Sequence, residues 1–89
     1  MPDLQDYAKE QIAKIVPEFN NLELRATVSD TSYSIEFFVS INGEKKQCYE
    51  LADNGIIDEE ELDEVFARIA EYIRKGDDYQ KGNINKIDF

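Results

Sequence analysis

The sequence contains no histidine and only one cysteine, and these absences remove several kinds of chemistry at once. Without histidine, nucleophilic catalysis lacks its usual base, and no partner is evident that would activate Cys48 or a serine. Zinc, which proteins bind mainly through cysteine and histidine, has no ligand set. One cysteine also excludes an internal disulfide and suits a reducing compartment. We therefore expect no enzyme activity, no metal or cofactor, and a cytoplasmic location.

Long apolar runs are missing as well. No stretch approaches the roughly 20 apolar residues that a membrane-spanning helix needs, and no basic and then apolar leader opens the chain. Internal repeats, low-complexity tracts and linkers are absent. Of the 89 residues, 42% are hydrophobic, which is enough apolar material for a core. We expect one domain over residues 1–89.

Basic residues are scarce: ten Lys and Arg face twenty Asp and Glu, which gives a formal net charge of −10. Such a surface repels the phosphates of nucleic acids and anionic membranes, and it attracts basic proteins by long-range steering. The charge therefore favours a protein partner with a basic surface, and neither a nucleic acid, a membrane nor a small-molecule ligand is expected. The alternative is that acidity only keeps a small protein soluble.

The spacing of apolar residues predicts an α+β fold in which an antiparallel three-stranded meander packs on two helices, in the order α-β-β-β-α. Asp3 is a suitable N-cap for the first helix, which carries one apolar stripe at three- and four-residue steps. Pro17 disfavours helical geometry at Val16, so the first helix is expected to end about there.

Two strands are expected over residues 22–29 and 33–41, where apolar and polar residues alternate. Asn42 and Gly43 tolerate the positive φ of a type I′ turn, so a hairpin should lead into a third strand over residues 44–51. In the resulting register the apolar positions of the first two strands share one face, which a one-residue slip would destroy. The predicted pairs are Val28 with Tyr33, Ala26 with Ile35, Leu24 with Phe37, Leu22 with Val39, Arg25 with Glu36, Ile41 with Glu44, Phe37 with Cys48, and Glu36 with Tyr49.

The second face of this sheet is mostly polar but is expected to carry Phe38 and Tyr49. The alternating pattern gives no reason for two aromatic side chains there. Either the C-terminal segment covers them, or they form part of a contact surface. Cys48 is expected on the apolar face, where a cysteine acts as a small core residue.

The second helix is expected between Asp58 and Gly76. Asp58 is a suitable N-cap, Glu61 completes a capping box, and Gly76 can end the helix in left-handed geometry. The final NINKIDF can form a short edge strand. The buried stripe of the second helix should comprise Leu62, Val65, Phe66, Ile69, Ala70 and Ile73.

Acidic residues are concentrated around the start of this helix: from Glu50 to Glu64 there are eight acids and no base. The first turn of a helix favours each carboxylate by about 0.3–1 kcal/mol, which accounts for residues 58–61 but not for the acids on either side. Since water and salt screen exposed carboxylates, a solvated face without function is the alternative to a docking surface. That surface would comprise Glu50, Asp53, Asp58, Glu60, Glu61 and Glu64, with Phe38 and Tyr49 as apolar contacts.

Two further kinds of ligand, calcium and double-stranded RNA, do not fit the sequence. With Asp53 as the first ligand of a calcium loop, Glu64 falls at the twelfth position. Gly55 and Ile57 then stand where oxygen ligands are needed, and Asp58 replaces the required glycine. Double-stranded RNA-binding domains share the α-β-β-β-α order, but they grip phosphates with basic residues at the start of the second helix, where this chain has acids. We reject RNA binding on electrostatic grounds.

Three stretches resemble a known family: IVPEF (15–19), SYSIEFFVSINGEKKQCYEL (32–51) and DEEELDEVFARIAEYI (58–73). Together they look like the YezG-like bacterial immunity proteins, and the likeness covers most of the chain. The resemblance implies an antitoxin that shields its producer from a polymorphic toxin, such as one delivered by contact-dependent inhibition.

Two hypotheses about function follow. In the first, the chain is an immunity protein that neutralises a basic nuclease toxin, because an acidic inhibitor can occupy a nuclease cleft as a phosphate surrogate. In the second, it is a small acidic adaptor or regulator that binds a basic host protein. An enzyme that works through carboxylates alone is not expected, since none of the twenty acids lies in an apolar setting that singles it out.

Overall fold

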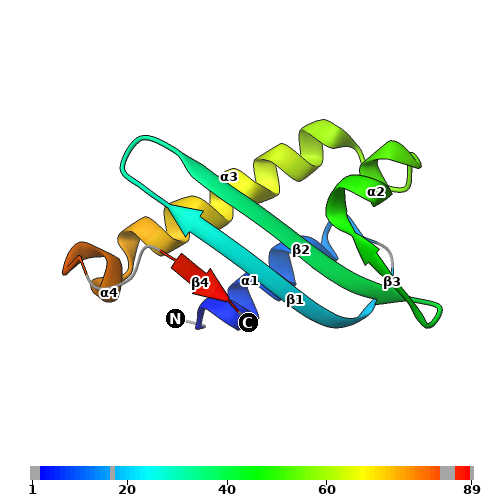
Figure 1. The fold of residues 1–89 in the computed structure, drawn as a ribbon, viewed down its shortest axis with the longest axis horizontal. Helices are drawn as coiled ribbons and strands as arrows, with labels where there is room; N and C mark the ends of the chain where they lie inside the picture. The colour runs from blue at the N-terminus through cyan, green and yellow to red at the C-terminus, as the bar shows by residue number, and fades with distance from the viewer. Residues whose placement is uncertain (1–2, 17, 83–85, 89) are drawn as a thin grey trace.

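The computed structural model describes residues 3–16, 18–82 and 86–88. The four strands of this part form one antiparallel sheet in the order β3-β2-β1-β4 (Figure 1). The α+β class with a meander is confirmed, and the short C-terminal edge strand exists as β4. The elements are α1 (Leu4–Ala13), β1 (Asn20–Val28), β2 (Tyr33–Ile41), β3 (Glu44–Gln47), α2 (Cys48–Asp53), α3 (Glu59–Lys75), α4 (Asp77–Gln80) and β4 (Lys86–Asp88).

Helix α1 begins where the sequence predicts. The Asp3 carboxylate accepts a hydrogen bond from the Asp6 N–H at 2.8 Å and caps the helix. The helix ends at Ala13, and the next two N–H groups donate to carbonyls three residues earlier, in a tighter turn. The predicted end near Val16 is therefore three residues late, and Pro17 lies outside the described residues.

The register between β1 and β2 is the predicted one, so their apolar side chains share one face. The β2–β3 turn is also confirmed, because Asn42 and Gly43 have φ values of 54° and 84°. One irregularity was not predicted: β1 contains a bulge at Asn21, which has a φ of 55°. The confirmed pairs are Val28 with Tyr33, Ala26 with Ile35, Leu24 with Phe37, Leu22 with Val39, Arg25 with Glu36, and Ile41 with Glu44.

The third strand is shorter than predicted. β3 ends at Gln47, and the chain turns directly into α2. The predicted pairs of Phe37 with Cys48 and of Glu36 with Tyr49 are therefore wrong. Cys48 and Leu51 are both fully buried, although residues three apart would point to opposite faces of a strand. A helix places both on one face, which is why the helix forms here.

The end of α2 carries a signal that the sequence reading missed. Gly55 has a φ of 75°, and its N–H donates to the Ala52 carbonyl at 3.1 Å. The Ile56 N–H donates to the Leu51 carbonyl at 3.0 Å. These two bonds form a Schellman motif, a common helix ending that favours glycine at the left-handed position.

Helix α3 buries the predicted stripe but ends differently. Gly76 has a φ of −71° and is extended, so the predicted left-handed ending is wrong. The chain passes straight into α4, and a Cβ at Gly76 would lie 3.2 Å from the Ile73 oxygen, a close approach that glycine allows. The stripe comprises Leu62, Val65, Phe66, Ile69, Ala70 and Ile73, all buried.

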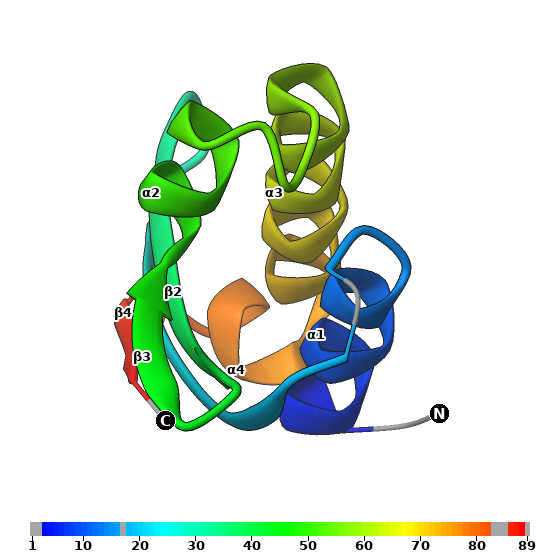
Figure 2. The ribbon, with the colours of Figure 1, turned by 90° about the vertical axis from the view of Figure 1, so that its right-hand side faces the viewer.

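The core lies between the sheet and the helices α1 and α3. Figure 2 shows both helices on one side of the sheet, and no described helix covers the opposite face, which we call the bare face. The rings of Tyr7 and Tyr72 stack at 4.1 Å and join α1 to α3. Leu24, Phe37 and Ile69 are among the buried side chains that fill the interior.

Candidate functional site

The predicted acidic residues lie at one end of the molecule. Helix α2 and the N-terminal turns of α3 lie side by side there, at the upper right of Figure 1. We call residues 49–64 the acidic end. They include eight acids and no base, so the rest of the chain carries the other twelve acids and all ten bases. Most of the net charge of −10 therefore comes from this end.

Local folding explains why these carboxylates are exposed. The apolar stripe of α3 faces the sheet, which leaves Glu60, Glu61 and Glu64 on the exposed surface of the helix. The Asp58 carboxylate accepts a hydrogen bond from the Glu60 N–H at 2.8 Å and caps α3. Free N–H groups and the helix dipole at this terminus favour negative charge.

Two of the six predicted carboxylates form ion pairs. Glu50 lies 3.5 Å from Lys46, and Glu64 lies 3.5 Å from Arg68 one turn along α3. Lys46 also pairs with Glu44 at 3.2 Å. Its hydrogen bond to Glu44 and the charge of Glu50 raise the pKa of Lys46. Lys46 is thus shared between two carboxylates and only partly compensates Glu50.

The other predicted carboxylates are less compensated. Asp53, Glu60 and Glu61 are exposed and form no ion pair within residues 3–16, 18–82 and 86–88. Asp58 is occupied with capping α3, which leaves its negative charge in place. The acidic end therefore presents an electronegative surface and not a set of local ion pairs.

Phe38 and Tyr49, which were both predicted on the second face of the sheet, lie in different places. Phe38 lies on the bare face beneath Lys45, whose Nζ is 5.1 Å from the ring centre. Tyr49 belongs to α2, and its ring meets that of Phe66 edge-on at 6.1 Å. Of the two predicted apolar contacts, only Tyr49 lies at the acidic end. β4 extends the sheet beside β1 and does not lie over the bare face.

Tyr49 and Ile56 place apolar surface within the acidic end. They are 48% and 46% exposed, although both are large apolar residues. Ile56 was not predicted as a site residue. The adjacent pair Ile56-Ile57 before the Asp58 cap could have indicated it, since two neighbouring side chains in a short loop rarely both point into the core. Because Ile57 is buried, its neighbour is directed outward.

Two titratable groups of α2 have altered pKa values. Partial burial raises the pKa of the Tyr49 hydroxyl, and nearby Cys48, Glu36 and Asp63 act in the same direction. Burial also raises the pKa of the Cys48 thiol. The thiol therefore stays protonated and buried, as expected for a small core residue and not for a nucleophile.

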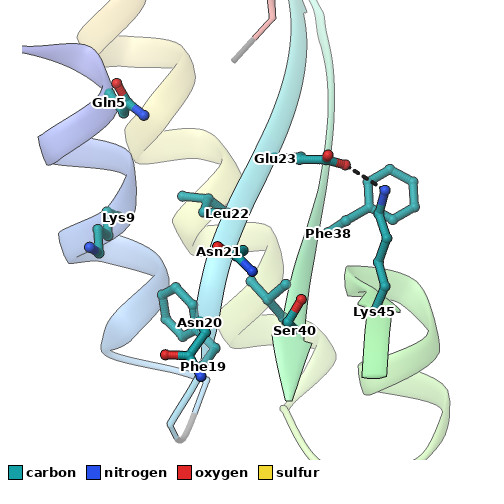
Figure 3. A pocket seen from close by; sticks show the side chains of 11 residues that line it. Gln5, Lys9, Phe19, Asn20, Asn21, Leu22, Glu23, Phe38, Ser40 and Lys45 are labelled. Atoms are coloured by element: carbon teal, nitrogen blue, oxygen red, sulfur yellow. Dashed lines mark ion pairs between the residues drawn. The ribbon is translucent and has the colours of Figure 1, made fainter. Parts of the chain in front are cut away.

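A hollow of about 600 Å³ lies outside the acidic end. Figure 3 shows it between α1, which contributes Gln5 and Lys9, and the neighbouring ends of β1 and β2. The bulge residue Asn21 lines it. Glu23 and Lys45 form a 2.6 Å ion pair at its side, and this hydrogen bond and charge lower the pKa of Glu23. Both groups are exposed, so the pair supplies no desolvated acid or base.

Across the described ranges, no group of three or more His, Cys, Asp or Glu side chains is placed to hold a metal ion. No helix in them is long and apolar enough to cross a bilayer.

The fold and the site define a two-layer α+β domain with one strongly acidic end. Comparisons of the chain with protein-family models, with curated proteins and with solved structures found no match.

Proposed function

We propose that this protein is a cytoplasmic immunity protein, which binds a cognate bacterial toxin through the acidic end and neutralises it. The observation that carries the proposal is the charge distribution: eight acids and no base lie in residues 49–64, beside the exposed side chains of Tyr49 and Ile56. An apolar contact with a charged rim is a common design of protein-binding surfaces.

The sign of the charge specifies the partner. A basic nuclease fits best, because its cleft is built to hold phosphates and the carboxylates of the acidic end can take their place. Opposite charges steer the two proteins together and raise the association rate, while Tyr49 and Ile56 slow dissociation through apolar contact. The immunity function is also supported by the resemblance to YezG-like immunity proteins, which residues 15–19, 32–51 and 58–73 carry.

A growth assay tests the proposal. The product of the neighbouring open reading frame is expressed in a bacterial host with or without this chain, and growth is followed. The wild-type chain should restore growth. The double variant Glu60→Lys and Glu61→Lys should protect poorly, because it reverses two charges that have no ion-pair partner among the described residues.

A matched control separates this surface from overall charge. The double variant Asp6→Lys and Glu10→Lys makes the same change in net charge on exposed positions of α1, away from the acidic end, and should protect as well as the wild type. Thermal unfolding of both double variants checks that each is folded. If the neighbouring product is harmless, or if the wild-type chain does not restore growth, the proposed function is wrong. Equal protection by both double variants would show that the toxin does not bind through the acidic end. A harmless neighbour would favour an adaptor for a basic host protein.

A further inference from the structure

The outer edge of β2 is paired over only part of its length. β3 pairs with Phe38–Ile41, and the chain then turns into α2. No described strand lies beside Tyr33–Phe37 on that side. The register between β2 and β3 places the main-chain groups of Tyr33, Ile35 and Phe37 toward this edge, since such groups alternate along an antiparallel strand.

Two side chains of α2 contact this part of the edge: the buried Cys48 thiol lies against the Phe37 main chain, and Tyr49 reaches Ile35. The Tyr49 hydroxyl donates to the Ile35 oxygen at 3.2 Å and takes the place of a neighbouring strand's N–H. Within the described ranges, no hydrogen bond is found for the edge-facing N–H groups of Tyr33 and Ile35. The edge thus offers unused donors beside an acceptor that only a half-exposed side chain covers.

The surrounding charge decides what can occupy this edge. The predicted continuation of β3 would have run here, but in the structure α2 begins beside Phe37, and Tyr33–Glu36 is the part of this edge that no described strand or buried side chain of α2 covers. A second copy of this protein would bring another net charge of −10 against the first, and repulsion opposes that pairing. Charge at the edge itself is mixed, because Glu36 pairs with Arg25 at 3.8 Å and the Arg74 guanidinium lies 5.9 Å from the Tyr33 ring centre. The excess of negative charge comes from the adjoining acidic end, to which Tyr49 belongs.

We propose that Tyr33–Glu36 of β2 accepts an extended, lysine- or arginine-bearing segment of the partner by strand addition. This inference rests on the proposed function and specifies how a cationic partner docks next to the acidic end. Main-chain hydrogen bonds to Tyr33 and Ile35 hold the added strand, and basic side chains of the same segment meet the exposed carboxylates of the adjoining acidic end. Tyr49 releases the Ile35 oxygen when the strand binds.

The test uses an eight-residue peptide that alternates lysine with valine, and a matched peptide with glutamate in place of lysine. Hydrogen exchange of the ¹⁵N-labelled protein is followed by NMR. Saturating lysine peptide should slow exchange of the Tyr33 and Ile35 amides at least about tenfold, because exchange then requires the added strand to leave. The glutamate peptide should leave both amides unprotected.

Two variants at position 33 distinguish the contribution of the main-chain N–H from that of the tyrosine side chain. Tyr33→Pro removes the outward N–H at the first residue of the strand, where proline is tolerated, and should abolish the protection at Ile35. Tyr33→Ala keeps that N–H and should retain the protection. Thermal unfolding checks that both variants are folded.

Protection of the Tyr33 and Ile35 amides by the lysine peptide, lost only in Tyr33→Pro, supports strand addition. If the peptide perturbs the acidic end and leaves these amides unprotected, or perturbs no residue, strand addition is wrong. Either result leaves the proposed function to be judged by the growth assay, so the two failures are distinguishable.

Discussion

The hydroxyl of Tyr49 donates a hydrogen bond to the main-chain oxygen of Ile35 across 3.2 Å. This bond joins α2 to the edge of β2 where the predicted third strand would have continued. It satisfies one carbonyl that a neighbouring strand would otherwise use. Tyr49 therefore holds α2 against the sheet and also marks the boundary between the acidic end and the free edge.

Replacing Tyr49 with phenylalanine should remove this bond and little else. The free energy of unfolding should fall by about 0.5–1.5 kcal/mol, which is the usual net contribution of one such hydrogen bond. Urea denaturation measures the change. Tyr33→Phe is the matched control, because no hydrogen bond of the Tyr33 hydroxyl is found within the described ranges. Equal losses in both variants would contradict a specific role for the Tyr49 bond.

Stability should fall in the alkaline range because of Tyr49 and Tyr79. Burial raises the pKa of Tyr49, and the 2.6 Å hydrogen bond to Asp30 raises the pKa of Tyr79. Both hydroxyls hold their protons more tightly in the folded chain than in the unfolded one. Their contribution is therefore complete below pH ~10 and is lost as the pH rises through the folded pKa values.

Absorbance of ionised tyrosine, recorded against pH, checks this behaviour. Part of the absorbance change should occur at a pH above the usual range of tyrosine ionisation. The variants Tyr49→Phe and Tyr79→Phe should each reduce that late part of the change. A titration whose late part is the same in all three proteins would show that these two hydroxyls are not responsible.

Gln11 of α1 is a weak point in the core. It is 5% exposed, and no hydrogen-bond partner for its Oε1 is found among the described residues. A buried polar atom without a partner costs about 1–3 kcal/mol, so Gln11→Leu should raise the free energy of unfolding by about 1 kcal/mol. Gln5→Leu, on the exposed side of the same helix, should change it little. Destabilisation by Gln11→Leu would mean that the amide has a partner in solution.

Leu51 and Ile56 should have opposite roles, although they lie five residues apart. Leu51 is fully buried and anchors α2, so Leu51→Ala should lower the free energy of unfolding by about 2–5 kcal/mol. Ile56 is 46% exposed, so Ile56→Ala should leave stability nearly unchanged and weaken binding of the partner. Thermal unfolding and binding titration measure the two effects. A large loss of stability in Ile56→Ala would remove Ile56 from the binding surface.

Most of the sheet could be predicted because its signals are local. Alternation in β1 and β2 and the Asn42-Gly43 turn together specify one register, and a shift by one residue would bury polar side chains. The third strand was predicted too long because Tyr49 resembles a strand residue when it is read by alternation. The helical spacing of Cys48 and Leu51 and the glycine at position 55 carried the better signal.

The candidate site could be predicted only in part. The position of the acids in sequence places them at one end, since α2 and the start of α3 are joined by a short loop. Their ion pairs depend on where Lys46 and Arg68 come to lie, which the tertiary fold decides. The exposure of Ile56 and the free part of the β2 edge follow from α2, so both were missed together with that helix.

The most direct test is the association rate of this chain with the purified cognate toxin, measured by stopped flow over a range of salt concentrations. The wild-type rate should fall steeply as salt rises, because salt screens the attraction to the acidic end. At low salt, the double variant Glu60→Lys and Glu61→Lys should associate at least about tenfold more slowly than the wild type. Its association rate should also depend less on the salt concentration. The control variant, Asp6→Lys with Glu10→Lys, should stay close to the wild type. The same rate and the same salt dependence in all three proteins would contradict binding through the acidic end.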